Sequence, residues 1–95
     1  MSMKLTQLQC KEVICVDSGR RLGYVEDVQI QLPEGNVVSL IVPCAGRLLG
    51  LGSIRQEYCI PWNCVRRIGP DIILVDIKPN DCLFPRHKYS LPFSW

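Results

Sequence analysis

The chain has 95 residues, a net charge of +2, 47% hydrophobic residues and 21% charged residues. A chain of this length forms one domain and buries only roughly 60–65% of the surface that it exposes when unfolded, so its core is thin. The composition excludes a disordered chain and a large enzyme, and no apolar run approaches the roughly 20 residues of a membrane-spanning helix. The first nine residues also lack the apolar run of a signal peptide, and we therefore expect a cytoplasmic protein.

Six cysteines, at positions 10, 15, 44, 59, 64 and 82, are the unusual feature of this composition. They remain below the roughly 8–10% that marks a disulfide scaffold, and the cytosol keeps thiols reduced. Cys10 and Cys15 are separated by four residues, as are Cys59 and Cys64, whereas metal knuckles generally have two intervening residues. We expect free thiols that pack as small hydrophobic residues, and a zinc site built from these two pairs is the alternative.

Taken in chain order, the sequence consists of short apolar runs separated by turns. Before them, Thr6 is expected to cap a single helical turn that ends at Gln9, with Leu5 and Leu8 facing inward. The β-branched and alternating runs then predict six strands, over residues 12–16, 22–32, 37–42, 54–60, 64–68 and 72–77. Short strands joined by hairpin turns are typical of a small closed barrel, which leaves no free sheet edge. The predicted fold is all-β, with a six-stranded barrel.

The second predicted strand has the clearest alternation. Val28, Ile30 and Leu32 alternate with glutamines, so these three apolar side chains should lie on one face. Val25 is out of phase with them, which indicates a bulge near residues 26–27.

Two further residues set local expectations. Pro43 should end the third strand, because proline has no N–H to donate to a ladder. Trp62 follows a proline at a strand break and is expected to plug one end of the barrel, with an outward-facing position as the alternative. Residues 46–53 should form a glycine-rich loop.

The C-terminal stretch of residues 78–95 differs from the rest of the chain. Prolines at positions 79, 85 and 92 keep it out of a helix or a central strand. Four of the seven aromatic residues lie within its last twelve positions: Phe84, Tyr89, Phe93 and Trp95. We expect an extended tail that packs across its own barrel or docks on another copy or a partner.

Two pairs of segments together resemble a known family. The sequence Lys-Glu-Val-Ile at 11–14, followed by Gly-Arg-Arg-Leu-Gly-Tyr-Val at 19–25, is similar to the opening hairpin of PRC-barrel domains. Ile-Pro-Trp at 60–62, followed by residues 65–75 with their Ile-Gly-Pro-Asp, is similar to the closing half. The combination resembles the YlmC/YmxH group of small stand-alone PRC-barrel proteins of sporulating bacteria. This resemblance covers residues 3–77, and it implies a barrel used as an interaction or assembly module with a sporulation link.

The sequence offers little catalytic chemistry. A single histidine near the end, with aspartates in turns or on outward positions, assembles no triad, and Gly-Leu-Gly at 50–52 lacks a phosphate-binding context. We therefore expect no enzyme activity and no cofactor. Nucleic-acid (RNA) binding remains an alternative, because arginine pairs at 20–21 and 66–67, a basic run at 86–88, and Tyr24 or Tyr58 as a stacking platform would suit it. Nine acidic residues nearly cancel the eleven basic ones, however.

The expected function is therefore a non-catalytic protein-interaction module that associates with itself as a homodimer. The candidate partner-surface residues are one aromatic residue at the strand break, the arginine pair that follows it and the aromatic residues of the tail: Trp62, Arg66, Arg67, Phe84, Tyr89, Phe93 and Trp95.

Overall fold

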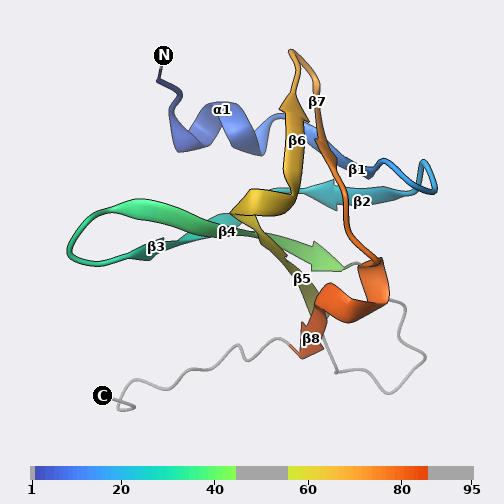
Figure 1. The fold of residues 1–95 in the computed structure, drawn as a ribbon. Helices are drawn as coiled ribbons and strands as arrows, with labels where there is room; N and C mark the ends of the chain where they lie inside the picture. Colours follow the sequence, from blue (N-terminus) through green and yellow to red (C-terminus); the bar gives the residue numbers. More distant parts are fainter. Residues whose placement is uncertain (1, 45–55, 86–95) are drawn as a thin grey trace.

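The computed structural model describes residues 2–44 and 56–85, which form eight short strands, one α-helix and two 3₁₀ helices (Figure 1). The first sheet has the order β2-β1-β7-β6 and the second has the order β3-β4-β5-β8. The first sheet consists of β1 (Glu12–Cys15), β2 (Arg21–Tyr24), β6 (Val65–Ile68) and β7 (Ile72–Val75). The second consists of β3 (Asp27–Gln31), β4 (Asn36–Cys44), β5 (Gln56–Pro61) and β8 (Leu83–Pro85). The helices are α1 (Leu5–Gln9), η1 (Trp62–Cys64) and η2 (Pro79–Cys82).

The all-β class is confirmed, but the closed six-stranded barrel is not: the described residues form eight strands in two separate four-stranded sheets. Residues 22–32 do not form one strand, because β2 pairs with β1 in the first sheet and β3 pairs with β4 in the second. The chain changes sheets at Val25, which is buried, and Glu26, whose N–H donates to the carbonyl of Ile41 at 2.8 Å. Where a bulge was expected, near residues 26–27, the chain passes from one four-stranded sheet to the other.

Residues 78–85 also differ from the expected extended tail. They form η2 and β8, and β8 pairs antiparallel with β5 from Gln56 to Tyr58. Cys82, at the end of η2, joins the hydrophobic core. Proline at position 85 is compatible with this strand because β8 is the last in its sheet. The expected loop at 46–53 and the remainder of the tail lie outside the described residues.

Pro43 does not end its strand. It lies inside β4 and pairs with Glu57, and Cys44 continues the ladder opposite Gln56. The pairing of β4 with β3 stops earlier, at Ile41 opposite Asp27. Since β3 does not extend alongside Pro43, the missing N–H removes no hydrogen bond to that neighbour.

The N-terminal helical turn exists, but its cap differs from the prediction. Lys4, not Thr6, occupies the N-cap position, and its backbone N–H donates to Oε1 of Gln7 at 2.8 Å. Leu8 is buried as predicted, whereas Leu5 is 39% exposed.

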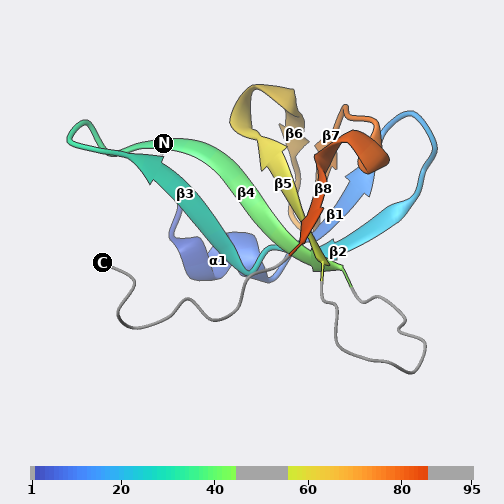
Figure 2. The ribbon, with the colours of Figure 1, turned by 90° about the horizontal axis from the view of Figure 1, so that it is seen from below.

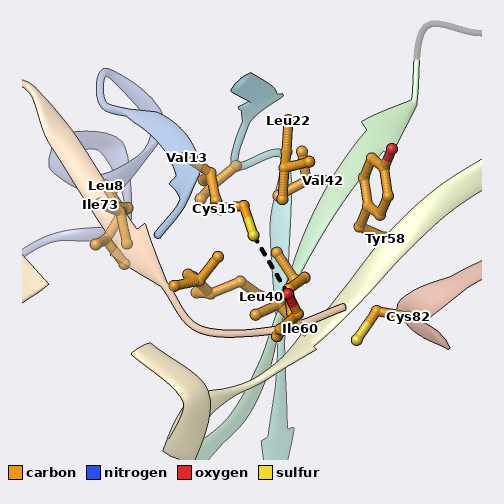
Figure 3. Close-up of a cluster of buried hydrophobic side chains, with 13 residues drawn as sticks. Leu8, Val13, Cys15, Leu22, Leu40, Val42, Tyr58, Ile60, Ile73 and Cys82 are labelled. Carbon is orange, nitrogen blue, oxygen red and sulfur yellow. Dashed lines mark hydrogen bonds between the residues drawn. The ribbon is translucent and has the colours of Figure 1, made fainter. Parts of the chain in front are cut away.

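The core lies between the two sheets and takes alternate residues from β1, β4, β5 and β7 (Figure 3). Its completely buried side chains are those of Val13, Cys15, Leu40, Val42, Ile60, Ile73 and Val75. The alternation predicted for the strands at 54–60 and 72–77 is confirmed, because Tyr58 and Ile60 are buried on β5, as are Ile73, Val75 and Ile77 in and after β7. The side chain of Lys11 closes one end of the first sheet, where its Nζ donates to the carbonyls of Gly69 and Pro70 at 2.8 and 2.9 Å.

The β3–β4 hairpin extends past this core. Figures 1 and 2 both show its closed end projecting away from the remaining strands. Leu40 and Val42 of β4 are completely buried, whereas Val38, nearer the turn, is 43% exposed. The outer half of the hairpin therefore lacks the facing sheet that covers the inner half.

Candidate interaction surface

Exposed apolar side chains gather on the outer half of the β3–β4 hairpin. The exposed fractions are 51% for Ile30, 72% for Leu32 and 43% for Val38. Val28, two residues before Ile30 on β3, packs against the core. The apolar face of β3 therefore begins in the core and continues, uncovered, toward the turn.

Trp62 extends this region across the neighbouring strand. Pro61, the last residue of β5, pairs with Ser39 of β4, and η1 begins at the next residue. Trp62 therefore lies just past the end of the β4–β5 pairing, next to Val38 of β4. The helix η1 packs against β4. The prediction that Trp62 plugs a barrel end is wrong, because 38% of its surface is exposed. We call Ile30, Leu32, Val38 and Trp62 the apolar hairpin surface.

Arg66 lies beside this surface. Its Nη1 donates to the carbonyl oxygen of Asn63, within η1, at 3.0 Å. Its Nη2 lies 3.4 Å from Oδ2 of Asp76, and both side chains are about half exposed, at 52% and 49%. A solvent-exposed pair of this kind contributes roughly 0–1 kcal/mol. Arg67 is exposed on the next position of β6 and has no ion pair within the described part of the chain.

Phe84 belongs to a different region. It lies on β8 opposite Glu57 and is 48% exposed. Trp62 follows the other end of β5, and five residues of strand span roughly 17 Å. The structure thus brings Trp62 and Arg66 together and separates them from Phe84. Tyr89, Phe93 and Trp95 lie outside the described residues.

Three residues of the apolar hairpin surface were missing from the sequence-based candidates: Ile30, Leu32 and Val38. For Ile30 and Leu32 the signal was present in the alternation of residues 28–32, which predicts a shared face. Periodicity assigns side chains to a face but does not show whether another sheet covers it.

The six cysteines are all unbonded thiols. Cys15 and Cys82 belong to the core, as expected for small hydrophobic residues. Burial raises the pKa of Cys82, and the neighbouring Cys64, Asp81 and Cys59 raise it further. Among residues 2–44 and 56–85, no three side chains of the metal-binding types lie close enough to hold an ion.

A pocket of about 360 Å³ lies between the β1–β2 turn and η2, with Cys15 in its lining. The thiol of Cys15 donates to the carbonyl oxygen of Ile77 at 3.2 Å. Burial opposes ionisation of this thiol, but hydrogen bonds, chiefly those with the backbone and hydroxyl of Ser18, outweigh it and leave the pKa of Cys15 lowered. The single histidine of the chain is at position 87, so the described residues supply no imidazole base beside the thiol.

Within residues 2–44 and 56–85, the two arginine pairs do not form one continuous stripe. Arg21 is on β2 and Arg66 is on β6, which are the two outer strands of the first sheet. Three strand spacings separate these strands by roughly 14 Å. Arg21 also lies 3.8 Å from the carboxylate of Glu12. Tyr58 is buried, so it cannot stack on a base, although Tyr24 is exposed.

With two four-stranded sheets packed around a shared core, the described part of the molecule is a small all-β domain. The chain belongs to the PRC-barrel domain family, whose sequence model matches residues 1–80. The resemblance seen in the sequence is thereby confirmed.

Three relatives match this chain over most of their own length. The chain is 33% identical over 76 residues to the probable sporulation protein YlmC of Bacillus subtilis strain 168, a match that covers 80% of this chain and 94% of YlmC. It is 29% identical over 77 residues to the uncharacterized protein YmxH of the same organism, covering 79% and 89%. An uncharacterized protein of Clostridium acetobutylicum is 32% identical over 75 residues, covering 79% and 85%. No helix in the described part of the chain is long and apolar enough to cross a membrane.

Proposed function

We propose that this protein is a non-catalytic interaction and assembly module that acts in the cytoplasm. The observation that supports it is the apolar hairpin surface, where four large side chains at one end of the second sheet are 38% to 72% exposed. Single exposed apolar residues are ordinary, but a contiguous group is typical of a binding surface. The name of YlmC, a probable sporulation protein, supports a role in sporulation.

The proposed assembled unit is a homodimer. A domain of this size has a thin core, and burying an exposed apolar end against a second copy adds apolar contact without a longer chain. The small size of the surface favours a reversible dimer rather than a permanent one.

Sedimentation of the full-length chain over a wide concentration range tests this proposal. We expect the weight-average mass to rise from that of a monomer toward that of a dimer. A chain ending at Pro85 is the matched control, because it keeps Cys82 in the core and β8 paired with β5. A mass that stays monomeric at every concentration would contradict self-association. A dimer lost only in the shortened chain would assign assembly to residues 86–95.

A further inference from the structure

The hairpin that carries the apolar surface has almost no charge. Residues 27–44 contain no lysine or arginine, and their only carboxylates are those of Asp27 and Glu34. Oδ1 of Asp27 accepts a hydrogen bond from the N–H of Val28 at 2.8 Å, so this carboxylate is engaged within its own strand. Glu34, in the exposed turn, has no ion pair among the described residues.

The two ends of the apolar hairpin surface carry complementary groups. At the tip, Leu32 is 72% exposed and lies two residues from the carboxylate of Glu34. At the base, Trp62 is 38% exposed. Arg66 donates a hydrogen bond to the carbonyl of Asn63, which follows Trp62 in η1. One end thus pairs an apolar side chain with an anion, and the other pairs an apolar side chain with a weakly engaged cation.

Building on the proposed function, we propose that two copies join through the apolar hairpin surface with their hairpins antiparallel. A two-fold axis through the middle of the hairpin brings each tip to the base of the other copy. Leu32 then packs on Trp62 of the partner subunit, and Glu34 approaches Arg66 of the partner subunit. Because the contact is isologous, each of these pairs occurs twice.

Charge favours a second copy over the chain's own C-terminal segment as the occupant. Residues 86–88 are Arg-His-Lys, and no aspartate or glutamate follows Asp81. That segment would bring cations to Arg66, whereas a second copy brings the carboxylate of Glu34. Opposite charges at the rim of an interface set its register and its rate of formation.

Sedimentation equilibrium of full-length variants tests the arrangement. Leu32→Asp should weaken the dimer at least tenfold, because it puts a charge against an aromatic side chain. Glu34→Arg and Arg66→Glu should each weaken it severalfold, and the double variant should recover most of the loss. Val16→Asp and Arg67→Glu are the matched controls. Val16 is 44% exposed, outside the surface, and Arg67 is adjacent in sequence to Arg66. Both should leave the dimer unchanged.

The outcomes separate this inference from the proposed function. A dimer that persists unchanged in Leu32→Asp would overturn the surface while leaving self-association intact. A double variant no better than its single variants would overturn the antiparallel arrangement. Loss of the dimer in the chain ending at Pro85 would show residues 86–95 to be the occupant instead. A wild-type chain that stays monomeric would overturn both proposals. Urea unfolding of each variant, with an unchanged midpoint, shows that the fold is retained.

Discussion

The β1–β7 pair and the β3–β4 hairpin are built from similar short apolar strands but end in different environments. In β1 and β7, every second residue is buried, and Val13, Cys15, Ile73 and Val75 are completely inaccessible. In β3, only Val28 packs against the core, and the remaining four residues are all exposed. The first pair lies in the middle of its sheet, with the second sheet facing it. The comparison shows that alternation provides an apolar face, while the position of the facing sheet decides whether that face becomes core or contact surface.

The largest expected effect comes from shortening a side chain in the covered β1–β7 pair. Ile73→Ala should lower the free energy of unfolding by about 2–5 kcal/mol, because it leaves a cavity at a completely buried site. Ile30→Ala should lower it by less than about 0.5 kcal/mol when measured on monomer, because the side chain is 51% exposed. Urea unfolding at low protein concentration measures both. Equal losses would mean that the hairpin is as well covered as the first sheet.

A smaller effect is expected where the two sheets approach each other. Gly23 of β2 has φ of +126°, and an added Cβ would lie 3.3 Å from Cγ1 of Val42 on β4. Gly23→Ala should therefore cost about 1–3 kcal/mol, from backbone strain and the close contact together.

Gly35→Ala is the matched control for this substitution. Gly35 lies in the hairpin turn, with φ of +83°, and its added Cβ would meet nothing within 4 Å. Its cost should be limited to the backbone term, about 1–2 kcal/mol. A thermal unfolding scan of the two variants compares them directly, and a larger loss at Gly35 would count against a tight approach of β2 to β4.

How far the sequence predicts this molecule depends on whether a feature is local. The buried faces of β5 and β7 follow from period-two patterns within a few residues, and they are confirmed at Ile60 and Ile73. β8 could not be recognised, because a three-residue strand ending in Pro85 exists only where β5 offers a free edge. The expectation that Pro43 ends its strand fails for a similar reason, because β4 accepts a proline only where β3 no longer pairs with it.

The candidate site shows the same limit. Trp62 and Arg66 are candidates on the basis of their residue types, and the structure places Trp62 in η1 and bonds Arg66 to the carbonyl of Asn63 in the same helix. Ile30, Leu32 and Val38 resembled core residues, because apolar side chains alternating with polar ones usually face an interior. Their exposure depends on the distance that the hairpin runs beyond the facing sheet, which no local pattern contains.

The smallest expected effect is a pH dependence of stability that comes from Cys82 in the covered core. Burial in the core, together with Cys64, Asp81 and Cys59 nearby, raises the pKa of Cys82 above that of an unfolded thiol. The folded state therefore holds this proton more tightly than the unfolded state. The resulting stabilisation is complete below the unfolded pKa, about 8.5, and is lost as the pH rises through the folded value.

Unfolding under reducing conditions at neutral and alkaline pH should therefore show a steeper loss of stability in the wild type than in Cys82→Ala. Cys10→Ala, which removes an exposed thiol, is the control and should keep the wild-type slope. Comparing slopes rather than absolute stabilities removes the cost of the small cavity at Cys82, which is the same at both pH values. Parallel slopes in all three proteins would mean that the thiol of Cys82 ionises as freely in the folded state as in the unfolded chain.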